Sequence, residues 1–294
     1  MPYMTRSETG RLQASKGKTD RTRIWNPIEA VGDAIASRLN QYVDLVGIIV
    51  QSFPDLIFNW SRRSIRSVVS RQLLYTFFDA IPVALRIGGA AGMLLIVQAA
   101  MLSESLGGDT EAVLPTIITT TIRDLAPLIA SLIVIGRSGS AIATELSIME
   151  ITEETELIGS LGIDPMPYVV MPRIVATTLS IPMLAMIILV AMFTTGYVVG
   201  LLINVIRMEP LAYIDTICRS LTVDDAWFFF PKTFVTGAVI GAICCIEGLQ
   251  VKTALTETPR VASRTGVRCL TAVFFISALL SFLLYGKFLV FDLI

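Results

Sequence analysis

Five long apolar runs follow one another along the chain and are separated by more polar segments. A helix that crosses a bilayer needs about 20 predominantly apolar residues. Runs of this length lie at about residues 73–102, 112–136, 174–206, 230–250 and 269–290. The third run is the clearest, because it contains no charged residue. The pattern predicts an all-α integral membrane protein whose five transmembrane helices form one domain over residues 72–294.

The first 71 residues are more polar. Residues 1–26 contain few bulky apolar groups, so we expect a flexible cytoplasmic tail. In residues 27–71 apolar side chains recur with a helical period among charged ones, which is typical of amphipathic helices on a membrane surface. A soluble helix is the alternative interpretation. A basic cluster ends this segment and consists of Arg62, Arg63, Arg66 and Arg71.

Lysine and arginine are distributed unevenly among the connections between the runs, and such residues favour the cytoplasmic side. The connection at 103–111 contains none. The connection at 251–268 contains Lys252, Arg260, Arg264 and Arg268. Together with the N-terminal cluster, this asymmetry predicts a cell inner-membrane protein with a cytoplasmic N-terminus, a cytoplasmic basic loop at 251–268 and a C-terminus outside.

The composition argues against most enzyme classes. Only 16% of the 294 residues are charged, whereas soluble domains average about 25%. Histidine is absent, which removes the commonest general base and zinc ligand. The four cysteines lack metal-site spacing, and Gly17-Lys18-Thr19 is no phosphate-binding loop because Leu12 stands at the first glycine position. We therefore expect no catalytic, metal or cofactor site, and no basic face for nucleic acid.

Ionisable residues inside the predicted spans mark candidate functional positions, because charge is expensive in lipid. Arg86 lies in the first span, and Arg123 and Asp124 lie near the middle of the second. Adjacent helical residues do not face one another, so we expect this pair to meet partners on different helices. Two interpretations stay open: a polar site that contacts a lipid headgroup or supports a moving helix, and a structural interhelical ion pair. Glu247 and Lys287 lie near span ends, where they can snorkel.

The connection between the second and third spans has a strongly acidic stretch. A helix is predicted from about 141 to 161, with Glu150, Glu153, Glu154 and Glu156 around it. Gly162 then favours a helix end, and Asp164-Pro165 a turn. This helix is either a docking element for a partner with a basic groove or a solvated loop helix.

Several motifs in this region carry a family resemblance. They are the segments RDLAP at 123–127, GRSGSA at 136–141, TEE at 152–154, GIDP at 162–165 and PR at 172–173. Their sequence and spacing resemble the signature of the MlaE/YrbE family, the permeases of MCE-type ABC lipid transport systems. The resemblance extends over roughly residues 60–290.

The resemblance implies an MlaE-like permease fold with N-terminal membrane-surface helices, five spans and dimeric assembly. It implies that a partner ABC-type ATPase binds the helix between spans two and three and hydrolyses the ATP. It also implies an MCE-domain substrate-binding oligomer on the outer face, and phospholipid held between the two protomers. The candidate ATPase-coupling residues are Glu150, Glu153, Glu154, Gly162, Asp164, Pro165 and Arg173. The candidate lipid path contains Arg86, Met93, Val97, Met101, Arg123 and Asp124.

Two features depart from the family pattern. Asp124 stands where the family has glutamate, and the segment 253–260 replaces a glycine-rich stretch. The chain therefore looks like a divergent member, such as one half of a heterodimer. Two other functions stay open. One is an ion-coupled secondary transporter with Arg123, Asp124 and Glu247 as its relay, although the internal repeat usual in such proteins is not evident. The other is a non-transporting membrane scaffold.

Overall fold

The computed structural model describes residues 47, 63–105, 110–162, 165–206, 208–250 and 258–291. The chain divides into two compact units, and all of these residues belong to the second, Gly47–Ile294. Within these ranges the regular elements are all helical, and no strand occurs, which confirms the predicted all-α class. The predicted tail 1–26, and the predicted surface helices up to residue 62 apart from residue 47, lie outside the described residues.

Five helical segments in the described part of the chain are long and apolar enough to cross a membrane, as predicted. They are Arg66–Leu102, Leu114–Ile151, Tyr168–Leu202, Val223–Leu249 and Thr258–Leu283. Several extend well beyond the apolar runs, because a helix can continue into water with a polar surface that a hydropathy pattern does not register. The fifth begins at Thr258, so the predicted basic loop at 251–268 is partly wrong. Pro259 is its second residue, where a missing N–H is tolerated.

The first span is interrupted by a short turn in its N-terminal half. It consists of α3 (Arg63–Phe77), the 3-10 turn η1 (Phe78–Ala80) and α4 (Ile81–Ser105). Pro82 has no N–H for the carbonyl of Phe78, which instead accepts from the N–H of Ile81. The segment 63–71, predicted as part of a surface helix, belongs to α3, whose Val69 packs with buried residues of the third span.

The second span is one long run of helix with two wider π-helical turns. It contains α5 (Thr110–Thr120), η2 (Thr121–Leu125), α6 (Ala126–Val134), η3 (Ile135–Gly139) and α7 (Ser140–Ile151). The ring of Pro127 excludes the normal bond to the carbonyl of Arg123, which explains the first π turn. Such turns are frequent at functional sites.

The predicted helix from 141 to 161 is two helices rather than one. After α7 the chain turns at Thr152 and Glu153, and α8 (Glu154–Ser160) follows. The backbone of Glu153 is left-handed, with φ of 59°, which ends α7. α7 is also no solvated loop, because Ile142, Ala143 and Leu146 are buried in contact with α11 and α12.

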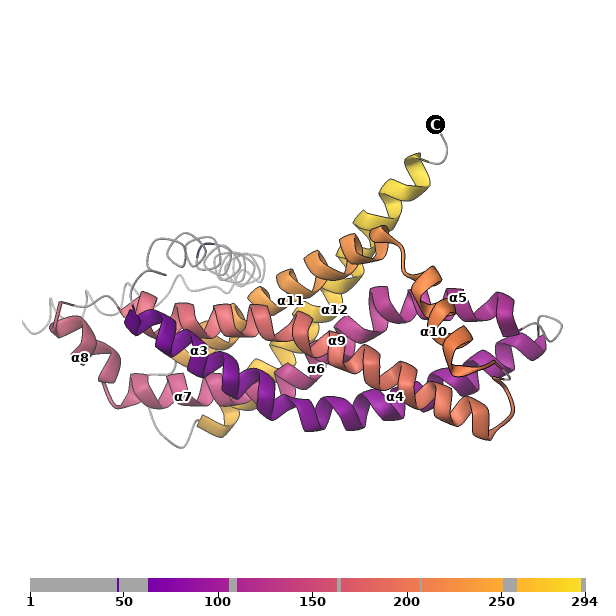
Figure 1. Cartoon of the computed structure of the whole chain (residues 1–294). Helices are drawn as coiled ribbons and strands as arrows, with labels where there is room; N and C mark the ends of the chain where they lie inside the picture. The colour runs from indigo at the N-terminus through magenta and orange to yellow at the C-terminus, as the bar shows by residue number, and fades with distance from the viewer. Residues whose placement is uncertain are drawn as a thin grey trace, which may run out of the picture. The chain divides into compact units, whose positions relative to one another are not determined.

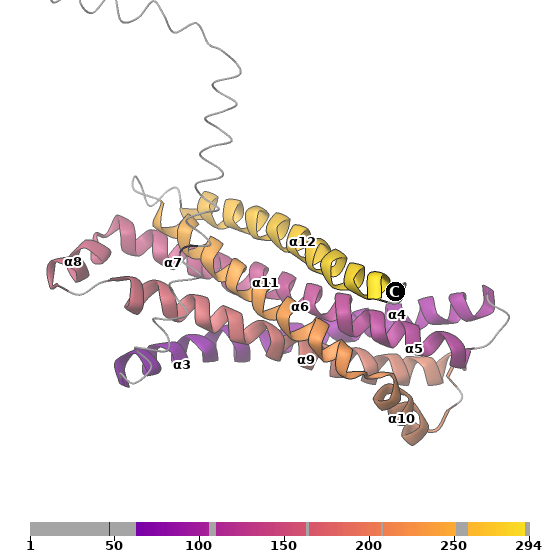
Figure 2. The ribbon, with the colours of Figure 1, turned by 90° about the horizontal axis from the view of Figure 1, so that it is seen from above.

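The remaining elements are η4 (Met166–Val170), α9 (Met171–Leu202), α10 (Pro210–Ser220), α11 (Val223–Leu249) and α12 (Thr258–Phe291). α9 is central and packs against α3, α4, α6 and α11. Figures 1 and 2 show α8 and α10 at opposite ends of the bundle.

Glycines let the central helices approach at backbone distance. A Cβ atom on Gly92 of α4 would lie 2.3 Å from the carbonyl oxygen of Met192 in α9. A Cβ on Gly241 of α11 would lie 2.9 Å from the Cα of Ile174 on the same helix α9. The hydroxyl of Thr195 also donates to the carbonyl of Gly89 at 3.1 Å. Small residues of this kind are the usual means of tight helix association in membranes.

Candidate functional site

Arg123 lies in the π turn η2 and faces the start of α11. Its Nε donates to Oδ1 of Asp225 at 2.5 Å, and its guanidinium lies 4.6 Å from the centre of the Phe228 ring. The second carboxylate oxygen of Asp225 accepts the backbone N–H of Thr222 at 2.8 Å and completes a capping box. Asp225 is 1% exposed. Its carboxylate therefore ties the second span to the first turn of the fourth.

Asp124, the next residue, forms a separate contact with Lys232 of α11. The ammonium of Lys232 donates to Asp124 Oδ1 and, at 2.8 Å, to Ser281 Oγ on α12. The Ser281 hydroxyl in turn donates to Asp124 Oδ1 at 2.9 Å. The Lys232 side chain is 3% exposed and that of Asp124 is 36% exposed. This triangle joins the second, fourth and fifth spans.

Both ionic partners of the Arg123–Asp124 pair lie on α11, and not on different helices as expected. Asp225 and Lys232 are seven residues apart, so they share one face of α11, about 10 Å apart along its axis. The long arginine side chain reaches one of them, and the short aspartate contacts the other directly. Although Asp124 is one methylene shorter than the family glutamate, it reaches its partners on two other helices. Arg123 pairs with Asp225 and Asp124 pairs with Lys232, so each of the four charges has a partner of opposite sign. This geometry supports the structural ion-pair interpretation.

Sequence reasoning missed three members of this network. Asp225 lies just before the fourth apolar run, and Thr222-x-x-Asp225 has the spacing of a capping box. Lys232 lies inside the fourth apolar run, and that position alone was a usable signal. Ser281 carries no such signal, because serine is common in apolar helices.

A second ionic cluster lies at the other end of α11. Glu247, which is 4% exposed, binds Arg264 Nε at 3.3 Å and Arg268 Nη1, both on α12. Glu247 is therefore buried and paired and does not snorkel. Arg260 is exposed on the first turn of the same helix. Lys232 and Glu247 are 15 residues apart, about 22 Å along α11, so a relay through Arg123, Asp124 and Glu247 has no continuous path.

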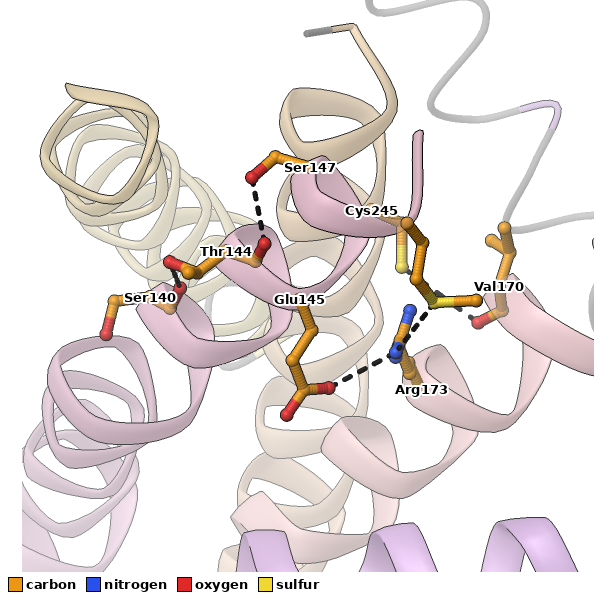
Figure 3. A network of polar contacts seen from close by, with 8 residues as sticks. Ser140, Thr144, Glu145, Ser147, Val170, Arg173 and Cys245 are labelled. Carbon is orange, nitrogen blue, oxygen red and sulfur yellow. Dashed lines mark hydrogen bonds and ion pairs between the residues drawn. The ribbon is translucent and has the colours of Figure 1, made fainter. Parts of the chain in front are cut away.

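Arg173 of α9 contacts α7, the helix that precedes α8 (Figure 3). Its Nη2 donates to Glu145 Oε2 at 3.2 Å, and the arginine side chain is 12% exposed. The same view shows Cys245 of α11, whose sulfur lies 4.0 Å from the carbonyl oxygen of Val170. Arg173 thus links α9 to α7 and is not displayed to a partner.

α8 itself is largely exposed. None of its described side chains is buried. Leu157 within α8 is 61% exposed, and Leu161 directly after α8 is 75% exposed. Glu153 and Glu154 are exposed, whereas Glu150 on α7 and Pro165 are partly buried. Gly162 ends this segment with φ of 74°. Asp164 lies outside the described residues.

The candidate lipid-path residues of the first span share the outward face of α4. Arg86, Met93, Val97 and Met101 are exposed, and the three apolar ones are 48%, 45% and 70% exposed. Gly88 and Gly92 lie on the opposite face against α9. A cavity of about 30 Å³ between α4, α5, α9 and α10 lies on that buried side and is lined by Gly92 and Tyr213 among others. The candidate residues therefore face away from the bundle.

Two further contacts join neighbouring elements. At the junction of α3 and α4, Arg137 of η3 binds Asp79 Oδ2 at 2.9 Å and the carbonyl of Tyr75 at 3.3 Å. On α10, Tyr213 donates to the carbonyl of Phe193 at 3.4 Å. Burial raises the pKa of Tyr213 to about 12, so this phenol stays a neutral donor.

Comparison with known proteins matches the family model described as Permease MlaE to residues 69–283. A probable ABC transporter permease protein of Rickettsia typhi is 31% identical over 182 residues, which cover 62% of this chain and 69% of the relative. A probable ABC transporter permease protein of Synechocystis is 28% identical over 209 residues, 70% of this chain and 78% of the relative. The chloroplastic Arabidopsis thaliana protein TRIGALACTOSYLDIACYLGLYCEROL 1 is 32% identical over 168 residues, 54% of this chain and 45% of the relative.

Proposed function

This chain belongs to the MlaE family of ABC transporter permeases, and from that premise we propose that it carries phospholipid across or out of the cell inner membrane. The observation that carries the proposal is the outward face of α4, whose exposed residues Met93, Val97 and Met101 form a continuous apolar stripe. Long apolar stripes at a helix surface mark binding or lipid-contacting faces.

The lipid pocket in this proposal lies between two protomers. The cavity beside Gly92 is about 30 Å³, enough for one water molecule and far too small for a lipid. The α4 faces of two copies, or of this chain and a related one, supply a larger apolar surface. The Arabidopsis relative is named for a galactolipid, trigalactosyldiacylglycerol, which supports a lipid as the cargo.

The energy in this proposal comes from ATP bound and hydrolysed by a partner ATPase, with no cofactor on this chain. α8 is the docking element, because its exposed carboxylates suit a basic groove. A displacement of α8 has a path into the bundle, since α7 continues into the second span and packs on α11 and α12. The N-terminus and α8 then face the cytoplasm, while α10 faces outward toward an MCE-domain oligomer.

Purification of the native complex tests this function. We expect the chain to elute with an ABC-type ATPase, an MCE-domain protein and a second permease protomer, and mass spectrometry to detect bound phospholipid. Elution without an ATPase, together with ion-dependent uptake of a solute, would instead favour a secondary transporter. A chain that elutes with other proteins but without lipid or ATPase would indicate a scaffold.

Reversing the charge of Glu153 and Glu154 tests the docking element. We expect Glu153→Lys with Glu154→Lys to weaken ATPase binding on the order of tenfold or more, because two attractive contacts become repulsive. The measurement is ATPase binding and lipid-stimulated ATP hydrolysis in nanodiscs. Lysine near the start of α8 also opposes the helix dipole, so the neutral pair Glu153→Gln with Glu154→Gln is measured beside it.

The matched control is Glu209→Lys, which reverses an exposed carboxylate at the opposite end of the bundle. This variant should bind ATPase as wild type does. Unchanged ATPase binding and lipid transfer in the Glu153 and Glu154 variant would rule out α8 as the coupling element.

A further inference from the structure

We infer that Arg86 binds the phosphate of a phospholipid, at the end of the α4 stripe nearest α3. This inference rests on the proposed lipid transport and specifies its headgroup site. Arg86 is exposed, and the structure places no carboxylate or hydrogen-bond acceptor on it among the described residues. Six other described cations inside the spans have a carboxylate partner, whereas the exposed Arg66, Arg71 and Arg260, close to where their spans begin, have none among the described residues. The six are Arg123, Arg137, Arg173, Lys232, Arg264 and Arg268.

An unpaired guanidinium on the lipid-facing side of a span requires an anion. Charged side chains inside a bilayer are rare because they are expensive to desolvate, and those that occur are usually paired. Arg86 cannot turn into the bundle, since the buried face of α4 is occupied by Gly88 and Gly92 in backbone contact with α9. Its anion must therefore come from outside this chain.

The depth of Arg86 suits a lipid phosphate. Arg137 directly follows the apolar run 112–136 and pairs with Asp79, and Arg86 lies seven residues after Asp79, about 10 Å along a helix. Helical side chains tilt toward the N-terminus, and arginine extends its charged end toward the membrane surface. The guanidinium of Arg86 thus reaches back to a level just below Asp79, which a phosphate can occupy.

The stripe beyond Arg86 provides for the acyl chain. Met93, Val97 and Met101 continue on the same face for about 22 Å from Arg86, longer than half of a hydrocarbon core of about 30 Å. A guanidinium matches a phosphate with two parallel hydrogen bonds. Headgroup and acyl chain are therefore recognised by one face of one helix.

A second protomer is a poorer source of the anion. In a dimer with a two-fold axis along the membrane normal, each residue meets the partner at its own depth. The exposed carboxylates that the structure describes without an ion pair belong to Glu153, Glu154 and Glu156 at α8, to Glu209 before α10 and to Asp224 in the first turn of α11. At the level of Arg86 the partner offers its own Arg86, and two like charges there favour a bound phosphate further.

A lipid titration tests this site on the full-length chain in detergent. Dioleoylphosphatidylglycerol, dioleoylglycerol and inorganic phosphate are added to wild type, Arg86→Gln, Arg86→Lys and the control Arg219→Gln, and bound lipid is counted by native mass spectrometry. We expect Arg86→Gln to bind phosphatidylglycerol about tenfold more weakly, as for loss of one charge-assisted contact. Arg86→Lys should be intermediate, and Arg219→Gln unchanged.

Dioleoylglycerol, which has the same chains without phosphate, should bind wild type and Arg86→Gln equally. Equal binding of phosphatidylglycerol by the two would overturn the inference, as would binding of inorganic phosphate but not of phosphatidylglycerol at Arg86. Dissociation of Arg86→Gln into monomers that still bind phosphatidylglycerol would identify a protein carboxylate as the partner. Because the titration needs no ATPase, it tests lipid binding at Arg86 even if the transport proposal fails.

Discussion

Asp124→Asn should destabilise the bundle by about 3–5 kcal/mol, the usual effect of removing one partner of a buried ion pair. The reason is the group left behind: Lys232 is 3% exposed and keeps only neutral partners, the amide oxygen that replaces the carboxylate and the Ser281 hydroxyl. Lys232→Met should be milder, because the abandoned carboxylate of Asp124 is 36% exposed. The double variant should recover most of the loss, since a neutral amide and an apolar side chain replace the ionic pair and no buried charge is left unpaired.

The measurement is a double-mutant cycle on thermal unfolding in a mild detergent. Asp215→Asn is the matched control, because it breaks an ion pair with Arg219 whose side chains are 57% and 80% exposed. Such a surface pair contributes at most about 1 kcal/mol. If Asp124→Asn and Lys232→Met were additive, the two side chains would not interact. If lipid transfer were lost in the double variant while stability recovered, the network would serve movement and not only structure.

The number of spans was predictable because each span satisfies its own backbone hydrogen bonds and must be apolar along its whole length in lipid. Hydropathy is therefore a local signal. The ends of the helices were not predictable in the same way. The second span continues to Ile151 as a helix in which Ile142, Ala143 and Leu146 are buried. The break at Glu153 occurs in a Thr-Glu-Glu sequence without glycine or proline.

Some charged residues of the candidate site could be predicted from the sequence, but their partners could not. The cost of charge in lipid drew attention to Arg86, Arg123 and Asp124, since that cost depends on residue type and depth alone. Their partners depend on how neighbouring helices are rotated and shifted, which no single segment encodes. Lys232 and Ser281 meet Asp124 because glycine contacts bring α11 against α9 and α12 follows α11. Those contacts are tertiary, so the network follows from the fold and not from a motif.

Gly92→Ala should have the opposite effect from the same substitution at Gly266. A Cβ on Gly92 would lie 2.3 Å from the carbonyl oxygen and 2.9 Å from the Cα of Met192, so α4 and α9 must separate. Overpacking of this kind typically costs about 1–3 kcal/mol, occasionally more. A Cβ on Gly266 of α12 meets nothing within 4 Å, and alanine in a helix interior gains about 0.5–1 kcal/mol over glycine.

The two variants are compared by thermal unfolding and by phosphatidylglycerol titration. Because Met93 follows Gly92 directly, movement of α4 also displaces the exposed stripe, and we expect Gly92→Ala to lose both stability and lipid binding. Gly266→Ala should keep lipid binding and unfold at the same or a higher temperature. Equal stability of the two variants would mean that α4 and α9 do not meet at backbone distance. Lower stability with normal lipid binding would show that the exposed face of α4 binds lipid independently of the packing of α4 on α9.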